Sequence, residues 1–403
     1  MKVLMFGWEF PPFNSGGLGT ACYGLTKGLH NVGARVTFVL PRAHPNMKAD
    51  FVKLISADCE IISINSPLVG YMTSEEYNQT ILKHGKSSDI SHLYGHTLFE
   101  EVRRYAIKAG LIAAAEQFDI IHAHDWLTYL AGINAKRKSG KPLVVHVHAT
   151  EFDRTGGNVN QYVYDIERKG MHEADAIIAV SNFTKNKIVE HYGINPEKVH
   201  VVHNAVEFND NHFQEELFKI KETYKVVLFL GRITLQKGPD YFLYAAKKAL
   251  EIDPNIKFIV AGSGDMERFM IEKAAEFGIA DKVLFTGFLK GKEIDKAYQM
   301  ADLYVMPSVS EPFGITPLEA MRNGTPVLIS KQSGVSEVIS HCLKVDFWDI
   351  NQIVNKMLGV LKYKELSDTL KHHGSLEVKK FDWNIPAKQC VDVYNKVVGG
   401  RNG

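Results

Sequence analysis

The stretch from Val226 to Gly238, VVLFLGRITLQKG, decides the fold because it begins a second copy of a pattern that opens the chain. Its apolar run ends in Gly231, as the run Val3–Phe6 ends in Gly7. Near-continuous Val, Ile and Leu runs bounded by glycine and polar turns are typical of parallel strands that are buried on both faces of a sheet. A pattern that restarts in mid-chain predicts two domains of one architecture.

Further apolar runs alternate with helix-like segments in both halves, and this alternation predicts doubly wound α/β domains. Two such domains facing each other would enclose an interdomain cleft, lined by the carboxyl ends of the strands. The segment Ala43–Gly95 is too weakly patterned to place. Strands are expected at Lys2–Phe6, Val36–Leu40, Ile120–Ala123, Leu143–Val147, Ala176–Val180, Val199–Val202, Val226–Leu230, Lys257–Ala261, Lys282–Phe285, Asp302–Val305 and Pro326–Ile329.

The domain boundary is expected near the polar, Asn-rich segment Glu207–Thr223. We therefore predict an N-terminal domain at residues 1–206 and a C-terminal domain at residues 207–380. A helical pattern follows Phe381, and residues 381–403 form a separate closing segment.

Composition excludes several classes of protein. The 403 residues are 45% hydrophobic and 23% charged, the balance of a globular chain rather than a disordered or fibrous one. Lys and Arg number 47 against 46 Asp and Glu, so the basic excess typical of a nucleic-acid or anionic-membrane binder is missing. We expect no nucleic-acid partner, and the oligomeric state is left open.

Cysteine use and the N-terminal sequence favour a cytoplasmic location. Cys22, Cys59, Cys342 and Cys390 lie far apart and form no CxxC motif, which argues against a disulfide framework. The opening MKVLMFGWEFPP turns polar before a signal-peptide core is complete. No run approaches the ~18 apolar residues of a transmembrane segment.

The first candidate site is the loop Asn14-Ser15-Gly16-Gly17-Leu18-Gly19, between the first strand and the first helix. Adjacent glycines let a backbone approach a ligand, and a helix N-terminus favours anions. A tight turn without a ligand explains Gly16 and Gly17 equally well.

Histidines end two neighbouring strands, at His122 and His124 before Asp125, and at His146 and His148. Residues two apart on a strand share a face, so each pair can present two imidazoles together. Three interpretations compete: metal ligation, contact with a substrate or its protons, and buried histidines without a task.

Two loops of the second half carry further candidates. Arg232 and Lys237 follow a buried strand, where two fixed cations suit a phosphate or pyrophosphate, although solvated surface charges are the ordinary alternative. Gly262-Ser263-Gly264-Asp265 lacks the last glycine of GxGxxG. It is therefore a weak dinucleotide fingerprint, and a simple strand-to-helix turn is equally compatible.

The sharpest segment is SEPFGITPLEA, which follows the strand Asp302–Val305. A Pro/Gly loop leads into a helix that opens near Thr316, with Pro317 near its first position. The N–H groups of Gly314, Ile315 and Thr316 can bind phosphate oxygens. Glu311 and Glu319 lie on either side of that turn, an arrangement that would suit a sugar nucleotide. The alternative is that Glu311 only caps the turn and Glu319 is a solvated helix residue.

This segment, with its Glu-x7-Glu spacing, resembles the signature of retaining GT-B glycosyltransferases of family 4 and glycogen synthase type. GRITLQKG, GGLG, HAHDW, VVHVHATEF, AVSNFTK and HNAVEF also resemble motifs of that family, and the match extends from Lys2 to about Val398. GGL, HAHDW and EPFG are most similar to the glycogen synthase branch. Asn14 stands where that branch usually carries Lys.

The resemblance implies two Rossmann-like domains, with acceptor contacts in the first, the nucleotide-sugar donor in the second and a closing helix that crosses back to the first. It also implies roles for single residues. Arg232 and Lys237 would neutralise the leaving pyrophosphate, and Gly314, Ile315 and Thr316 would bind its distal phosphate. Glu311 would bind the transferred sugar, Glu319 the ribose, His148 the sugar near the reacting carbon, Gly16 and Gly17 the pyrophosphate, and Asp125 the acceptor or sugar.

We therefore expect a metal-independent, retaining hexosyltransferase without a cofactor, which moves glucose from ADP- or UDP-glucose to an α-glucan. The sequence has no DxD triplet of the kind that holds a divalent ion in other glycosyltransferases. Alternatives are another sugar nucleotide for polysaccharide or glycolipid assembly, a metal-dependent hydrolase built on the histidines, and a non-catalytic sugar-nucleotide-binding protein.

Overall fold

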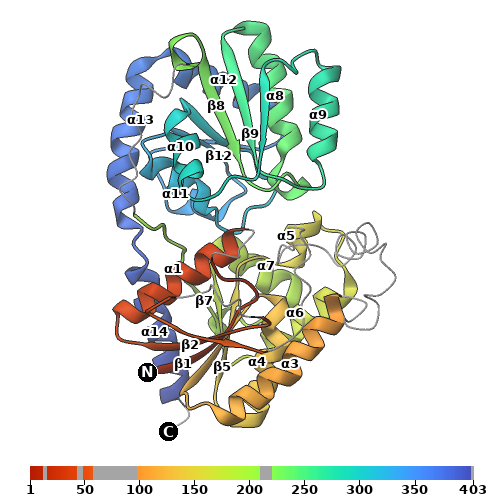
Figure 1. The fold of residues 1–403 in the computed structure, drawn as a ribbon, viewed down its shortest axis with the longest axis vertical. Coiled ribbons are helices and arrows are strands. Elements are labelled where there is room, and N and C mark those ends of the chain that lie inside the picture. The colour runs from red at the N-terminus through yellow and green to blue at the C-terminus, as the bar shows by residue number, and fades with distance from the viewer. Residues whose placement is uncertain (12–15, 43–48, 58–97, 209–219, 401–403) are drawn as a thin grey trace. The chain divides into compact units, whose positions relative to one another are not determined.

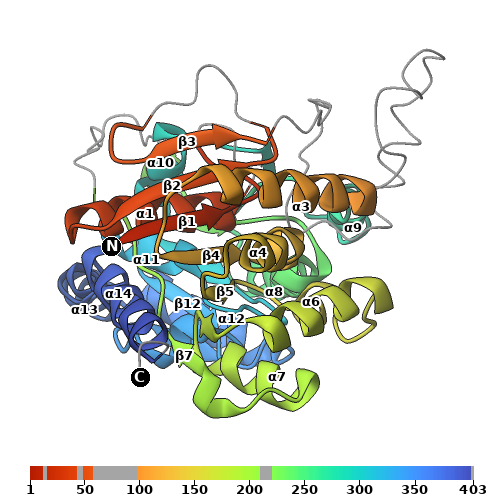
Figure 2. The ribbon, with the colours of Figure 1, turned by 90° about the horizontal axis from the view of Figure 1, so that it is seen from below.

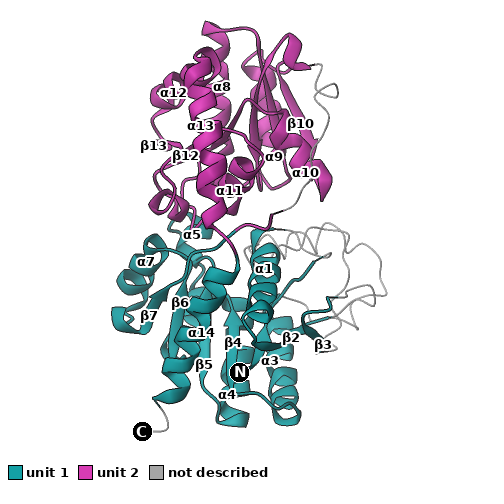
Figure 3. Cartoon of the chain, turned by 90° about the vertical axis from the view of Figure 1, so that its left-hand side faces the viewer, with its two compact units in different colours: residues 1–205, 383–403 teal, residues 206–382 magenta. Residues whose placement is uncertain are grey.

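The structure, a computed structural model, describes residues 1–11, 16–42, 49–57, 98–208 and 220–400. The chain forms two compact units, Met1–Ala205 with Trp383–Gly403, and Val206–Asp382 (Figure 3). Each unit is built on its own parallel sheet. Of the four cysteines, Cys22, Cys342 and Cys390 are free, and Cys59 lies outside the described residues.

The first unit contains a seven-stranded sheet of order β3-β2-β1-β4-β5-β6-β7. Figure 1 labels β1, β2, β5 and β7 of this sheet. All of its strand pairs are parallel, and β1 lies between β2 and β4, so the sheet is wound outward in both directions. Its elements are β1 (Lys2–Phe6), α1 (Gly17–Asn31), β2 (Arg35–Leu40), β3 (Lys53–Ser56), α3 (Leu98–Ala115), β4 (Ile120–His124), α4 (Trp126–Ser139), β5 (Leu143–Val147), α5 (Glu151–Thr155), α6 (Gln161–Glu173), β6 (Ala176–Ala179), α7 (Asn182–Tyr192), β7 (Val199–Val201) and α14 (Asn384–Gly399).

The second unit contains a six-stranded parallel sheet of order β10-β9-β8-β11-β12-β13. Here β8 takes the central place that β1 has in the first unit. Its elements are β8 (Lys225–Leu230), α8 (Pro239–Ile252), β9 (Ile256–Ala261), α9 (Glu267–Glu276), β10 (Val283–Gly287), α10 (Lys292–Met300), β11 (Leu303–Met306), α11 (Ile315–Arg322), β12 (Val327–Ser330), β13 (Leu343–Val345), α12 (Ile350–Lys362) and α13 (Lys364–Glu377).

Eleven predicted strands are therefore present to within two residues at each end, and the structure adds β3 and β13. Both additions are short edge strands at the ends of their sheets. An edge strand is only partly covered, so its apolar run is interrupted, as the half-buried residues of Lys53–Ser56 show. Most of the weakly patterned segment Ala43–Gly95 lies outside the described residues.

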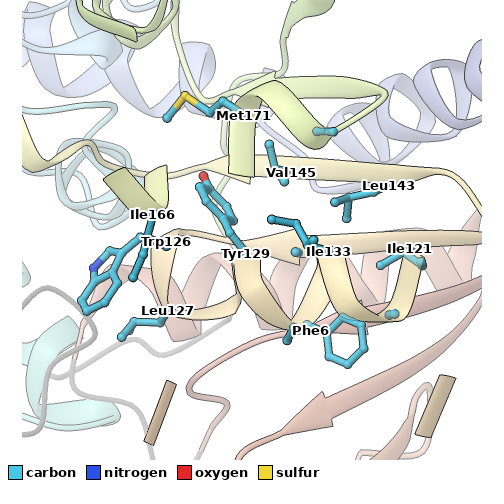
Figure 4. Close-up of a cluster of buried hydrophobic side chains, with 14 of the residues drawn as sticks. Phe6, Ile121, Trp126, Leu127, Tyr129, Ile133, Leu143, Val145, Ile166 and Met171 are labelled. Carbon is cyan, nitrogen blue, oxygen red and sulfur yellow. The ribbon is translucent and has the colours of Figure 1, made fainter. Parts of the chain in front are cut away.

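Alternating side chains of the first sheet lie in two different environments. Figure 2 shows α3, α4 and α6 on one side of this sheet and α1 and α14 on the other. Ile121, Ala123 and Val145 join an apolar core that includes Tyr129 of α4 and Met171 of α6. Figure 4 shows part of this core, with Ile121, Val145, Tyr129 and Met171 labelled. The intervening residues of the same strands are the histidines. They point to the opposite face, where Tyr394 of α14 hydrogen-bonds to His122.

The helices α1 and α14 pack closely together on this second face. An ideal Cβ at Gly24 would lie 2.2 Å from the ring of Trp383, and one at Gly28 would lie 2.4 Å from the Trp383 carbonyl oxygen. Glycine at these two positions lets Trp383 bury its ring, since only 6% of the residue remains exposed. The segment after residue 382 is thereby held on the first unit.

Gly28→Ala should lower the free energy of unfolding by about 1–3 kcal/mol, because the new methyl group meets main chain rather than a movable side chain. Gly399→Ala in α14 is the control, since no atom lies within 4 Å of its Cβ position. It should be neutral or stabilise by up to ~1 kcal/mol. Urea unfolding of both variants measures the difference, and equal effects would contradict the close packing.

Candidate functional site

Most candidates in the described residues lie at or shortly after the carboxyl end of a strand. In the first unit, β4 ends at His124 and is followed by Asp125, while β5 ends at Val147 and is followed by His148. In the second unit, the candidates lie in the loops after β8, β9 and β11 and in the helix α11. Parallel strands end on one edge of a sheet, so the topology itself gathers these side chains within each unit.

The four histidines form one buried array, as their spacing predicts. The rings of His122 and His124 stack at 4.3 Å between centroids, and those of His146 and His148 stack at 4.3 Å beside them. Hydrogen bonds join the two strands: His122 Nε2 lies 3.2 Å from His146 Nδ1, and His124 Nδ1 lies 2.9 Å from His148 Nε2. Burial lowers the pKa of His122 and of His148 to about 3, so both rings are neutral at physiological pH.

Asp125 links the ends of β4 and β5. Its Oδ1 accepts hydrogen bonds from the backbone N–H groups of His148, at 2.7 Å, and Ala149, at 3.4 Å. Asp125 has a φ of 57°, the only positive φ among the described non-glycine residues, and such a backbone costs about 1–3 kcal/mol. Burial raises the pKa of this carboxyl to about 7, and its Oδ2 has no partner among the described residues.

Besides Asp125, a buried ionic network contacts the segment that follows His148. Arg154 donates from Nη1 to the carbonyl oxygen of Ala149 at 3.1 Å and from Nε to Glu151 at 3.0 Å. It also pairs with Glu167, whose pKa is raised to about 7 by burial. The residues on both sides of the His148–Ala149 peptide are therefore fixed, and sequence reasoning missed Arg154 because nothing in its spacing distinguishes it from a surface cation.

One group of three side chains has the geometry to hold a metal ion. Ligand atoms of Cys22, His124 and His148 lie within 4.8 Å of one another, as do those of His122, His124 and His146. A metal lies in the plane of each imidazole that binds it, and the rings of His122 and His124 are stacked with an interplanar angle of only 21°. The second group therefore cannot converge on one ion. The first group can, although burial raises the pKa of the Cys22 thiol well above its usual value and so disfavours the thiolate that binds metals.

The second unit places its cations beside a carboxylate. Lys237, at the end of a short 3-10 helix after β8, forms an ion pair with Glu311, which is 6% exposed and follows β11. The two residues are 74 positions apart in sequence. Ser308 lies 3.4 Å from the same Glu311 oxygen. Sequence analysis proposed both residues but not their pairing.

Gln236 ties the two loops together and was missed from the sequence. Its Nε2 donates to the carbonyl oxygen of Ser310 at 3.0 Å, and its Oε1 accepts from Arg232 at 3.1 Å. Its own carbonyl oxygen accepts from the N–H of Val309 at 2.9 Å. Gln236 is 6% exposed, so these bonds are made out of contact with water. No signal beyond its place between the two cations marked this residue.

The helix α11 begins where the sequence predicts. Gly314 precedes it with a φ of 100°, a conformation that favours glycine, and Ile315 is its first residue. The hydroxyl of Thr316 lies 2.9 Å from that of Tyr304, which also donates to the carbonyl oxygen of Leu230 at 3.2 Å. The first turn of α11 is thereby tied to the end of β8.

Glu319 and the GSGD turn have clear structural partners. Glu319 accepts a hydrogen bond from Tyr298 at 3.1 Å, and burial raises its pKa.

An ideal Cβ at Gly262 would lie 1.8 Å from the carbonyl oxygen of Gly231, and one at Gly264 would lie 2.3 Å from that of Ile233. Contact with the loop that carries Arg232 therefore explains both glycines.

The first glycine loop is only partly within the described residues. Gly16 is the N-cap of α1 with an extended backbone, and Gly17 is exposed at its first turn. No described atom lies within 4 Å of a Cβ built at Gly17, so packing of the described residues does not require glycine there. Asn14 and Ser15 lie outside the described residues.

Comparison with known proteins identifies the family. Residues 15–210 match the family model described as Glycosyltransferase Family 4, and residues 210–375 match the one described as Glycosyl transferases group 1. An uncharacterized glycosyltransferase of Methanocaldococcus jannaschii is 31% identical over 418 residues, with 98% of each chain covered. The chain therefore belongs to the family 4 and group 1 glycosyltransferases.

Two more comparisons, one with a curated relative and one with a solved structure, support this assignment and the fold. A glycogen synthase of Mycobacterium tuberculosis is 25% identical over 354 residues, which cover 84% of this chain and 80% of that protein. A sucrose-phosphate synthase structure from Thermosynechococcus elongatus has a TM-score of 0.77 at 19% identity and covers 99% of this chain and 100% of its own. The predicted GT-B fold class of two Rossmann-like units is confirmed. No helix among the described residues combines the length and the apolar character needed to cross a bilayer.

The four buried histidines should make the free energy of unfolding depend on pH. The pKa of each of the four histidines is lowered, so the unfolded chain binds more protons below pH ~6.5 and acid destabilises the fold. The raised pKa values of Asp125 and Glu167 act in the opposite direction, because the folded chain holds their protons between about pH 4 and 7. Burial also raises the pKa of Glu319 and of Asp240, and it lowers that of His200, so five imidazoles oppose four carboxyls.

We therefore expect the urea midpoint to fall as the pH is lowered from 6.5 to 4.5. His122→Asn removes one titrating ring, and its midpoint should fall less steeply over the same range. Asp125→Asn removes an opposing carboxyl, so its midpoint should fall more steeply. Parallel profiles for all three proteins would contradict this account.

Proposed function

We propose that this glycosyltransferase moves glucose from ADP- or UDP-glucose to an α-glucan acceptor, in the manner of a glycogen synthase. The observation that carries the proposal is the placement of Lys237, Arg232 and Glu311 beside the N-terminus of α11, all within one unit. Cations and free N–H groups suit a diphosphate, and a buried carboxylate suits sugar hydroxyls. The similarity to a glycogen synthase over 80% of that protein supports the choice of glucose and glucan.

In this proposal the second unit binds the donor. Lys237 and Arg232 neutralise the pyrophosphate as it leaves, and the N–H groups of Gly314, Ile315 and Thr316 bind its distal phosphate. Glu311 binds hydroxyls of the transferred glucose, while Glu319 binds the ribose. Lys237 already pairs with Glu311. The donor would therefore bind on either side of an existing ion pair, with phosphate at the cation and sugar at the carboxylate.

The first unit contributes residues that contact the sugar and acceptor. His148 lies against the transferred sugar near the reacting carbon, where a neutral ring adds no positive charge next to an oxocarbenium-like centre. Asp125 lies by the acceptor or sugar, and its Oδ1 holds the His148 backbone. Gly16 and Gly17 let their loop approach the pyrophosphate.

We further propose that transfer retains the anomeric configuration and needs no metal. The bond from the anomeric carbon to the β-phosphate oxygen breaks, and the electron pair leaves with the nucleoside diphosphate. The acceptor hydroxyl attacks from the same side, and its proton passes to the departing phosphate. Two cations and a helix N-terminus meet the developing negative charge, which is the task a metal would otherwise perform.

A second candidate acceptor follows from one departure in the sequence. Asn14 stands where the glycogen synthase branch usually carries Lys near the donor. The alternative is therefore transfer from another sugar nucleotide to a different polysaccharide or a glycolipid.

The decisive assay offers ADP-glucose and UDP-glucose, each with and without maltooligosaccharide, in the presence and absence of EDTA. We expect one donor to extend the oligosaccharide by an α-linked glucose at a rate that EDTA leaves unchanged. NMR of the anomeric proton reports the configuration. Donor hydrolysis without extension would move the function to another acceptor, and a rate lost on chelation would contradict the metal-free mechanism.

Lys237→Ala and Glu311→Ala should each reduce turnover by several orders of magnitude, because both contacts strengthen as charge develops in the transition state. Lys331→Ala is the matched control, since it removes an exposed ion pair with Asp346 in the same unit. It should lower kcat by less than about twofold, as surface pairs contribute little. Near-wild-type turnover of either site variant would remove these residues from the mechanism.

A further inference from the structure

Three of the four buried histidines have no task in the proposed transfer. His122 and His124 are fully buried, and His146 is 2% exposed. Buried imidazoles are uncommon in a parallel sheet, where apolar side chains fill the same space at lower cost. The hydrogen bonds of the array indicate a role for one of these three residues, His124.

The array consists of two separate hydrogen-bonded chains. In one chain, the Tyr394 hydroxyl lies 2.5 Å from His122 Nδ1, and His122 Nε2 lies 3.2 Å from His146 Nδ1. In the other, His124 Nδ1 lies 2.9 Å from His148 Nε2. The two chains touch through ring stacking and not through a hydrogen bond. His148, the residue proposed to contact the sugar, therefore has His124 as its one imidazole partner.

A neutral imidazole has one N–H and one lone pair, so a bond between two of them fixes both tautomers together. Burial lowers the pKa of His124 well below its usual value and that of His148 to about 3. Either His124 Nδ1 donates to His148 Nε2, and Nδ1 of His148 then carries the proton, or His148 Nε2 donates, and its Nδ1 then carries a lone pair.

The outer nitrogen of His124 decides between these two arrangements. Nε2 of His124 is buried and has no partner among the described residues. If His148 were the donor, this Nε2 would be a buried N–H without an acceptor, which is the rarer and more costly state in folded proteins. If His124 is the donor, the same position is only an unused lone pair. The geometry therefore favours His124 as donor.

We propose that His124 is a positioning residue that fixes the tautomer of His148. It donates from Nδ1 to Nε2 of His148, so that Nδ1 of His148, the one nitrogen left for a ligand, carries a proton. His148 then donates a hydrogen bond to an oxygen of the bound sugar nucleotide and does not accept one. Only the identity of the ligand rests on the proposed function, because the tautomer is a property of the unliganded chain.

The tautomer can be measured directly by two-bond ¹H–¹⁵N correlation spectra of protein labelled with ¹⁵N-histidine, with His148→Gln used to assign the signal. We expect wild-type His148 to show the pattern of a ring protonated at Nδ1. A ring protonated at Nε2 in the wild-type protein would overturn the proposal without any variant.

Two variants of similar shape test the role of His124. Asn offers an amide N–H near the position of the imidazole Nδ1, whereas Leu offers no donor. His124→Asn should keep the proton of His148 on Nδ1, and His124→Leu should move it to Nε2 or produce a mixture. An unchanged His148 pattern in His124→Leu would overturn the proposal. Tyr394→Phe, which alters only the other hydrogen-bonded chain, should leave the His148 pattern unchanged.

Activity supplies a second readout that separates the two hypotheses. With the donor that supports transfer, His124→Leu should lower kcat/KM by about tenfold or more, as expected for a lost buried hydrogen bond, and His124→Asn should recover most of it. Glucan extension by a protein whose His148 is protonated at Nε2 contradicts the positioning role alone. The Nδ1 tautomer in a protein that extends no glucan contradicts the proposed function alone.

Discussion

The organisation of both units depends on one constraint: a parallel sheet covered by helices on both faces can expose polar groups only where its strands end. Asp125 and His148 follow β4 and β5, and Lys237 and Glu311 follow β8 and β11. The histidines at 122, 124 and 146 lie inside the sheet region, and they are tolerated because they hydrogen-bond to one another and to Tyr394. The candidate residue His148, which follows a strand end, is therefore hydrogen-bonded to His124 inside the sheet.

Apolar sequence patterns predicted eleven strands, because burial on both faces of a sheet requires nearly unbroken apolar runs. They did not predict β3 and β13, because strands at the edge of a sheet are not under that requirement. Candidate residues were identified by residue type and position after a strand. Their partners were not, because pairings such as Lys237 with Glu311 or Asp125 with the His148 backbone join segments that are distant in sequence. Gln236 and Arg154 were missed for the same reason, since each acts through contacts that no local spacing encodes.

The candidate residues of the two units differ in their charge. In the first, burial keeps the His148 ring neutral and raises the pKa of Asp125 to about 7, and Arg154 is paired with Glu151 and Glu167. In the second, Lys237 and Glu311 remain an ion pair that a charged ligand can divide between phosphate and sugar. An ion pair of this kind suits a ligand that carries both a diphosphate and hydroxyl groups.

The first unit is discontinuous in the chain, since residues 383–400 lie on it and all of the second unit intervenes. Trp383 fills the space left by Gly24 and Gly28, and Tyr394 is the hydrogen-bond partner of His122. During synthesis on a ribosome, the unit that emerges first therefore lacks these two side chains until the second unit has been made. The N-terminal unit is therefore the last to be completed, and His122 lacks its Tyr394 partner until the end of the chain has been made.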